Sequence, residues 1–171
     1  MSSEVGAKAG LAPLARRELT IRVVVNGAAF ERTIPARMTL VELLRQELSL
    51  VGTKVSCDAQ VCGACTVLVD RRPVSSCTYL AADADGRSVT TVEGLATGGE
   101  LHPLQEAFVE KMAAQCGFCT PGFLMMALAL LEEHSHPSRE EIMEHLDGNL
   151  CRCTGYAPII EAVESVVVEA R

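Results

Sequence analysis

The sequence predicts an α+β protein, in which a small mixed sheet grips one helix and a four-helix bundle follows. Two observations indicate this class. Apolar residues alternate with period two in the first half of the chain, and they recur at helical spacing after Gly94. We therefore expect a tail over residues 1–18, a strand-rich domain over residues 19–92 and a helical domain over residues 93–171.

The strand-rich domain begins with a predicted hairpin. Residues 18–25 place every second side chain on one face of a strand, and these side chains are Leu19, Ile21, Val23 and Val25. Asn26 and Gly27 follow directly, and this dipeptide is the strongest short signal for a hairpin turn. A second strand is therefore expected over residues 28–34.

One helix and three more strands complete the first half. Leucines recur at helical spacing over residues 38–48, and Thr39 with Glu42 predicts a capping box at the start of this helix. A turn is expected at Arg71-Arg72-Pro73. The strands expected on either side of it and beyond it span residues 65–69, 74–79 and 88–92.

Four helices are expected after residue 94, and each begins with a start signal. Pro103, Pro121 and Pro158 suit a first helical turn, and Ser138 has Glu141 three residues on. The expected ranges are 101–115, 121–133, 138–147 and 158–170. The second of these helices is apolar on every side, which predicts that it is buried inside the bundle or beneath another subunit.

Composition and charge exclude several classes of protein. The net charge is −7, with four Phe, two Tyr and no Trp, so the chain offers neither clustered cations nor a stacking surface to nucleic acid. The longest apolar run has nine residues, whereas a membrane span needs about 20. Arg16 and Arg17 could belong to an export signal, but charged residues interrupt the apolar stretch that should follow. We expect a cytoplasmic protein, whose cysteines serve metal or redox chemistry.

The eight cysteines fall into two groups of four. The first group has the spacing C-x4-C-x2-C-x11-C and consists of Cys57, Cys62, Cys65 and Cys77. Plant-type ferredoxins hold a [2Fe–2S] cluster with three cysteines at this spacing and a fourth from later in the chain. The residues between them are small or turn-forming, so the loop itself can aim backbone N–H groups at sulfur, and Gly63 suits a positive φ.

The second group has the spacing C-x2-C-x31-C-x1-C and consists of Cys116, Cys119, Cys151 and Cys153. Each pair precedes a predicted helix, where the helix dipole and free N–H groups favour thiolates. This spacing leaves three alternatives open. An iron–sulfur cluster fits, and so does zinc, although the one-residue gap suits zinc knuckles less well. A thioredoxin-type redox pair should follow a strand, whereas this pair follows a helix.

Three motifs together resemble a known family. They read Cys62-Gly-Ala-Cys65-Thr-Val, Gln115-Cys-Gly-Phe-Cys119-Thr-Pro-Gly122 and Gly148-Asn-Leu-Cys-Arg-Cys-Thr-Gly-Tyr156. In this order they look like the iron–sulfur subunit of molybdenum hydroxylases, the xanthine dehydrogenase family, which includes the small subunits of carbon monoxide dehydrogenases. The resemblance covers about residues 18–168, and none of the eight ligand positions departs from the family pattern.

The resemblance implies a β-grasp ferredoxin-like domain followed by a four-helix [2Fe–2S] domain, with one [2Fe–2S] cluster held by each group of cysteines. It also implies two partner chains. Gln115 matches the position that contacts the pterin of a molybdopterin cofactor on a large subunit, and Cys153 matches the cluster ligand nearest to that pterin. The first cluster then faces FAD on a medium subunit, in a heterotrimer that can pair as a dimer.

The function implied by the resemblance is electron conduction inside an oxidoreductase complex. Molybdenum chemistry delivers two electrons and each cluster takes one, so two clusters in series would relay single electrons to the flavin. The chain would have no catalytic residue of its own, because the substrate reacts on another chain. Two alternatives stay open at this stage: a free-standing ferredoxin-like carrier, and a structural adaptor that holds two zinc ions.

Overall fold

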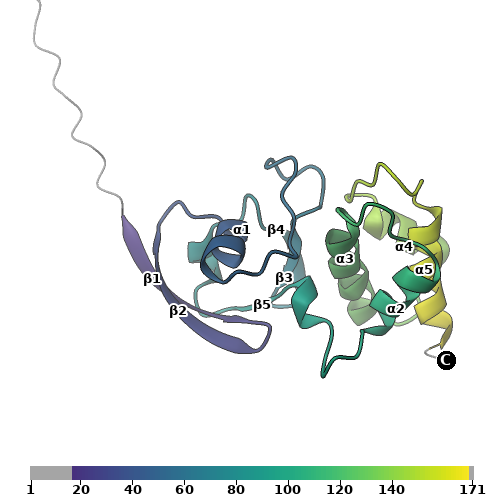
Figure 1. The fold of residues 1–171 in the computed structure, drawn as a ribbon, viewed down its shortest axis with the longest axis horizontal. Coiled ribbons are helices and arrows are strands. Elements are labelled where there is room, and N and C mark those ends of the chain that lie inside the picture. Colours follow the sequence, from purple (N-terminus) through teal and green to yellow (C-terminus); the bar gives the residue numbers. More distant parts are fainter. Residues whose placement is uncertain (1–16, 170–171) are drawn as a thin grey trace, which may run out of the picture.

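The computed structural model describes residues 17–169. The predicted tail over residues 1–18 therefore lies almost entirely outside the described residues. In the described chain a sheet lies at one end and the helices of the second half lie at the other (Figure 1). Among the described residues, no helix is long and apolar enough to cross a membrane.

The sheet has five strands in the order β2-β1-β5-β3-β4. β1 and β2 form the predicted hairpin, β5 runs parallel to β1, and β3 lies antiparallel to both β5 and β4. The prediction of a mixed sheet is thus confirmed. The strand bounds are Glu18–Val25 for β1, Ala28–Pro35 for β2, Thr66–Val69 for β3, Arg72–Ser75 for β4 and Ser88–Thr90 for β5.

The helix of the first half packs against this sheet. Thr39 and Glu42 form the predicted capping box, in which the Thr39 N–H donates to Glu42 Oε2 at 2.8 Å. The helix α1 spans Leu40–Glu42 and continues as a π-helical segment, Leu43–Glu47. Its buried leucines join apolar side chains of β1, β2, β3 and β5 in one core. Leu19, expected on the buried face of β1, is instead 40% exposed near the start of the strand.

The strand expected over residues 74–79 is placed differently in the structure. The turn before it lies at Asp70 and Arg71, whose φ angles are 48° and 68°, and β4 therefore starts at Arg72. Pro73 lies within β4, an edge strand, where a missing N–H is tolerated. After Ser75 the chain turns back on itself, because the N–H groups of Thr78 and Tyr79 both donate to the Ser75 carbonyl.

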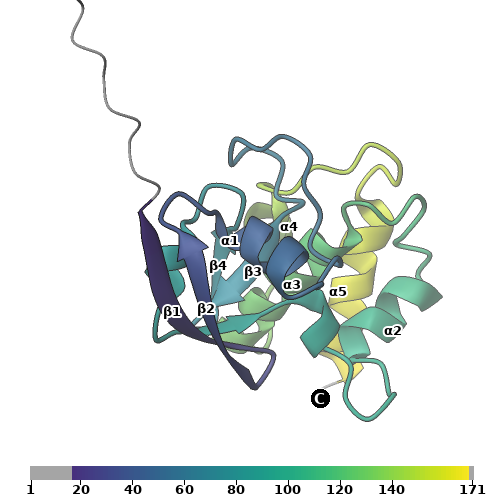
Figure 2. The same ribbon diagram turned by 60° about the vertical axis from the view of Figure 1, so that its left-hand side comes forward.

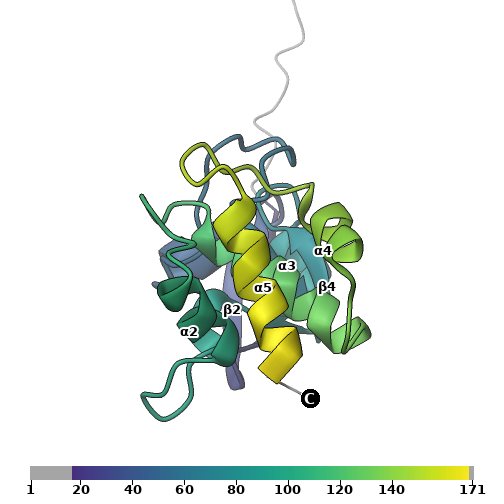
Figure 3. The ribbon, with the colours of Figure 1, turned by 90° about the vertical axis from the view of Figure 1, so that its right-hand side faces the viewer.

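All four predicted helices are present, although the first is shorter than expected (Figure 3). Met112 has a φ of 53°, and the Ala113 N–H donates to the Phe108 carbonyl at 2.9 Å. Both features are typical of the turn that ends a helix. The helix bounds are Pro103–Glu110 for α2, Thr120–Glu133 for α3, Arg139–Leu146 for α4 and Ala157–Glu169 for α5.

The apolar helix α3 lies between the sheet and the other helices (Figure 1) and contacts β3 and β4 directly. Seven of its residues are buried, from Gly122 to Leu130. Leu68 of β3 belongs to the same core as the helices. The prediction that this helix is buried is confirmed, because it is covered by the sheet on one side and by helices on the other.

Candidate metal centres

Both cysteine-bearing loops rise on the same side of the molecule, as Figures 1 and 2 show. The loop with the first three cysteines connects the π-helical segment to β3, and Cys77 follows β4. The second group comes from the loop between α2 and α3 and from the loop between α4 and α5. The junction of sheet and helices therefore brings together segments that are far apart in the sequence.

Cys57 is surrounded by backbone donors of its own loop. Its Sγ atom accepts hydrogen bonds from the N–H groups of Val61 at 3.3 Å and Cys62 at 3.4 Å. Asp58 and Gln60 have φ angles of 52° and 57°, which wrap the backbone around the sulfur. These hydrogen bonds lower the pKa of Cys57 to about 6, since they stabilise the thiolate. The prediction that this loop supplies its own donors is confirmed.

Cys65 and Cys77 lie deeper and pack together with Val41. Burial raises the pKa of Cys65 to about 11. Ser76 links the two cysteines, because it directly precedes Cys77 and its hydroxyl donates to the Cys65 carbonyl at 2.6 Å. A metal ion favours loss of the proton from a buried thiol such as Cys65, because it compensates the charge of the thiolate. The site is therefore suited to a buried metal centre.

The four cysteines of the second group line one cavity of about 370 Å³. Within residues 17–169, no three Cys, His, Asp or Glu side chains converge on a single point as one bound ion would require. The sulfurs are instead distributed around this space. Those of Cys116 and Cys153 lie 3.5 Å apart and both residues are exposed, whereas Cys119 and Cys151 form the inner side.

The thiols of the second group differ in their proton affinity. Burial raises the pKa of Cys119 to about 12. A hydrogen bond from the Phe118 N–H lowers the pKa of Cys116, and contact with Cys116 raises the pKa of Cys153. Burial pushes the pKa of Cys151 upwards, but hydrogen bonds from Thr154 outweigh it and leave the pKa lowered. Iron would displace the remaining protons from this set.

Tyr156 supports the second group in a way that sequence reasoning missed. Its phenol oxygen accepts a hydrogen bond from the Cys151 N–H at 3.1 Å, and its own N–H donates to Thr154 Oγ1 at 3.2 Å. The ring packs edge-to-face on Phe123, with centroids 6.3 Å apart. The only sequence signal is the Thr-Gly-Tyr run after Cys153, which gives no indication that the phenol folds back onto the loop.

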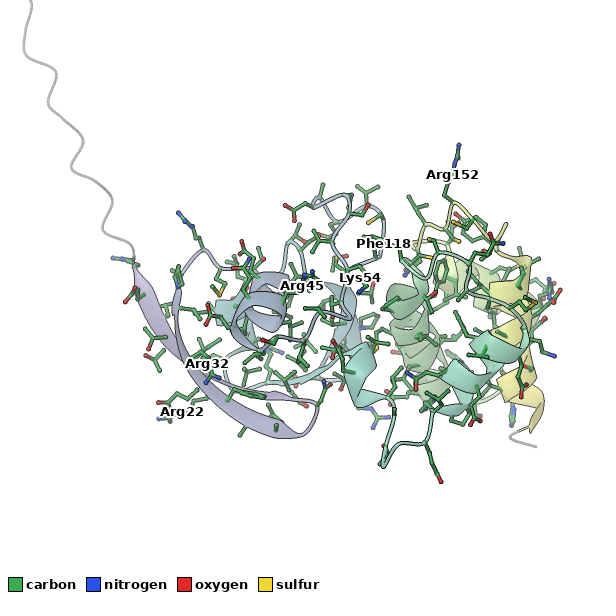
Figure 4. All side chains as sticks on the ribbon, viewed as in Figure 1. Arg22, Arg32, Arg45, Lys54, Phe118 and Arg152 are labelled. Atoms are coloured by element: carbon green, nitrogen blue, oxygen red, sulfur yellow. The ribbon has the colours of Figure 1, made fainter. Side chains whose placement is uncertain are left out.

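The outer side of the second group carries several exposed side chains. Gln115 is exposed next to Cys116. Figure 4 shows Arg152 extending away from the molecule above this loop, and Phe118 at the junction of the two halves. Phe118 and Leu150 are 44% and 52% exposed. These two side chains form an apolar rim beside the exposed sulfurs.

Comparison with known proteins identifies the family. A model for a 2Fe-2S iron–sulfur cluster binding domain matches residues 23–94, and a [2Fe-2S] binding domain model matches residues 91–164. The chain is 54% identical to the nicotine 6-hydroxylase small subunit of Paenarthrobacter nicotinovorans, over 84% of this chain and 86% of that protein. The chain belongs to the iron–sulfur subunits of the molybdenum hydroxylase family.

Other relatives of this iron–sulfur subunit support the same family assignment. It is 42% identical to the nicotinate dehydrogenase small FeS subunit of Eubacterium barkeri, over 88% of this chain and 96% of that one. Among solved structures, quinoline 2-oxidoreductase from Pseudomonas putida 86 matches with a TM-score of 0.86 and 45% identity, over 90% of this chain and 95% of that chain. The aldehyde oxidoreductase of Desulfovibrio desulfuricans matches with the same TM-score and 43% identity, over 89% of this chain but 17% of its own.

Proposed function

We propose that this iron–sulfur subunit relays single electrons between a molybdopterin cofactor on a large subunit and FAD on a medium subunit. The chain is an electron-transfer subunit of an oxidoreductase complex, as its small-subunit relatives indicate. The observation that carries the proposal is the arrangement of eight free cysteines in two groups at one junction. The substrate reacts on another chain, so this chain contributes conduction and not bond chemistry.

Each group of cysteines holds one [2Fe–2S] cluster in this proposal. Cys57, Cys62, Cys65 and Cys77 hold the first, and Cys116, Cys119, Cys151 and Cys153 hold the second. The donor set fits, because thiolates are the ligands of such clusters and backbone N–H groups already point at Cys57 and Cys151. When bound, each cluster gives or takes one electron. The chain supplies thiolates, N–H donors and a setting that excludes water from Cys65 and Cys77.

The proposal also divides the chain into two domains, one for each group of cysteines. We propose that residues 19–92 form a β-grasp ferredoxin-like domain and that residues 93–171 form a four-helix [2Fe–2S] domain. The sheet that packs against α1 supports the first assignment. Contacts of α3 with α4, of α2 with α5 and of α4 with α5 support the second. The two domain models, which meet near residue 92, agree with this boundary.

The outer side of the second group is where the large subunit would bind. Gln115 is exposed beside Cys116, and Cys153 is an exposed sulfur, so both can reach a pterin bound by another chain. The apolar rim of Phe118 and Leu150 favours a permanent partner over a free-standing ferredoxin-like carrier, since a carrier would leave this surface in water. Heterotrimers of this kind can pair as dimers.

The test is purification of the tagged chain from its native cells. We expect two further polypeptides to co-purify in equal amounts, one with molybdopterin and one with FAD. The preparation should be brown and contain acid-labile sulfide. A colourless preparation with zinc would contradict the clusters, and a brown chain that purifies alone as a monomer would instead support the free-standing carrier.

A further inference from the structure

A threonine directly follows four of the eight cysteines, in the pairs Cys65-Thr66, Cys77-Thr78, Cys119-Thr120 and Cys153-Thr154. A hydroxyl beside a metal ligand can donate a hydrogen bond to sulfur, and such donors tune a metal centre. In the first group both hydroxyls are used on oxygen instead. The Thr66 hydroxyl donates to the Gly63 carbonyl at 2.8 Å. The Thr78 hydroxyl donates to Gln60 Oε1 at 3.0 Å.

The second group places one of these hydroxyls on a cysteine sulfur. Thr154 Oγ1 lies 3.1 Å from Cys151 Sγ, and the Thr154 N–H donates to the same sulfur at 3.4 Å. Cys151 is 8% exposed, so water competes little for this contact. The Thr120 hydroxyl, by contrast, is buried and has no hydrogen-bond partner among the described residues. Two polar groups of Thr154 therefore converge on the sulfur of Cys151.

The proton between the Thr154 oxygen and the Cys151 sulfur belongs to Thr154. The Tyr156 N–H donates to Thr154 Oγ1 at 3.2 Å, in a turn where Gly155 and Tyr156 have φ angles of 69° and 70°. This local hydrogen bond fixes the hydroxyl oxygen and occupies one of its two lone pairs. A cysteine that ligates iron has lost its proton. The hydroxyl is then the only possible donor between the two atoms, and its proton points at the sulfur.

We propose that Thr154 is a positioning residue that raises the midpoint potential of the second centre, because its hydroxyl donates a hydrogen bond to the Cys151 ligand. This inference rests on the proposed function. Reduction adds one negative charge that the ligand sulfurs share, and a donor to sulfur stabilises this charge. The electron comes from the reductant in a titration and from a cofactor of a partner subunit in the working complex. The Thr154 proton stays on its oxygen, and no covalent bond forms or breaks.

The test compares the wild-type complex with Thr154→Val and Thr154→Ser complexes. Valine has nearly the shape of threonine without the hydroxyl, whereas serine keeps the hydroxyl. Redox titration followed by electron paramagnetic resonance (EPR) spectroscopy measures the midpoint potentials of both centres. At the wild-type midpoint, we expect the ratio of reduced to oxidised second centre to fall several-fold in Thr154→Val and to return to the wild-type value in Thr154→Ser. The first centre should titrate as in the wild type. A merely structural role would lower iron content or stability and leave the potential unchanged.

Thr78→Val is the matched control. Thr78 directly follows Cys77, as Thr154 follows Cys153, but its hydroxyl contacts oxygen atoms only, namely Gln60 Oε1 at 3.0 Å and the Ser75 carbonyl at 3.3 Å. Its removal takes no hydrogen bond from a sulfur, so both midpoint potentials should stay as in the wild type. A shift of either potential as large as that in Thr154→Val would overturn the specific role of the Thr154 hydroxyl.

An unchanged potential in Thr154→Val, or a shift that Thr154→Ser does not reverse, would overturn the inference. If the valine variant does not load the second centre, the wild-type complex decides. Electron–nuclear double resonance of its reduced second centre should then detect a strongly coupled proton that exchanges in D₂O and that Thr154→Ser retains. Absence of such a proton would overturn the inference. Failure of the proposed function is distinguishable, since the wild-type complex would then lack two [2Fe–2S] signals altogether.

Discussion

The phenol oxygen of Tyr156 accepts a hydrogen bond from the backbone N–H of Cys151 at 3.1 Å. This bond engages the N–H of a cysteine that belongs to the second group. In Tyr156→Phe the N–H loses this acceptor and becomes free to donate to a sulfur atom of the second centre. Because N–H donors to sulfur stabilise the reduced state, we expect the midpoint potential of that centre to rise. EPR-monitored redox titration measures the shift.

Tyr79→Phe serves as the control for this variant, since Tyr79 donates its hydroxyl proton to the Asp83 carbonyl at 3.1 Å and has no contact with the second group. It should leave both midpoint potentials unchanged. Equal potentials in wild type and Tyr156→Phe would show that the phenol has no influence on the second centre.

Substitution of Gly63 tests the junction between the two loops. In Gly63→Ala the new Cβ atom would meet Asn149 Cγ at 2.5 Å, in addition to the strain of an alanine at a φ of 67°. Gly86→Ala carries the strain alone, because Gly86 has a φ of 72° and no atom within 4 Å of an added Cβ. The strain costs about 1–2 kcal/mol and the overpacking about 1–3 kcal/mol more.

Chemical denaturation of both glycine variants measures these costs as losses in the free energy of unfolding. The loss should be larger for Gly63→Ala than for Gly86→Ala. Equal losses would mean that the loops separate without resistance, and the close junction would not exist in solution.

Single cysteine substitutions should remove one centre at a time. Cys65→Ser replaces a buried thiol of the first group, and Cys153→Ser replaces an exposed thiol of the second. We expect iron to fall from about four to about two atoms per chain in each variant, with the EPR signal of the other centre retained. If both variants lose the same signal, the assignment of the cysteines to two groups is wrong.

In the iron-free chain, the free energy of unfolding is expected to depend on pH through Cys57 and Cys65. The pKa of Cys57 is about 6, below the ordinary 9.0, so the stability that its thiolate contributes is present above pH 9 and is lost as the pH falls through 6. The pKa of Cys65 is raised to about 11, so its contribution is present below pH 9 and is lost as the pH rises through 11. Thiol labelling checks the direction in which each pKa is shifted, because only the thiolate reacts quickly.

With iodoacetamide at pH 7.5, Cys57 should react quickly and Cys119 should be protected, because a thiol with a pKa of about 12 is protonated there. Peptide mass mapping identifies the labelled residues. Equal labelling of both thiols would contradict the different environments that the structure assigns to them. Cys116, exposed and with a lowered pKa, is expected to react as well.

The parts of the fold that sequence reasoning predicted depend on short-range chemistry. Asn26-Gly27 makes its hairpin, and Ser138 with Glu141 makes its capping box, through residues that are neighbours in the chain. The ligand loop around Cys57 was predictable for the same reason, since its donors lie four and five residues away.

The parts that could not be predicted depend on packing between distant segments or on subtle backbone choices. The Asn149–Gly63 hydrogen bond spans 86 residues, and no periodicity or spacing relates the two positions. The turn at Asp70 and Arg71 uses positive φ angles at residues other than glycine, which sequence patterns do not indicate. The π-helical segment after α1 places Leu43 and Leu44 in the core, and the helical spacing of these leucines does not distinguish it from an α-helix.

The most direct test of the central claim is quantitative EPR spectroscopy of the native complex after reduction with dithionite. Four cysteines at each of two centres predict two distinct [2Fe–2S] signals of equal intensity, which together account for about two unpaired spins per chain. A single signal with one spin per chain, or no iron–sulfur signal at all, would contradict the claim that this subunit holds two clusters.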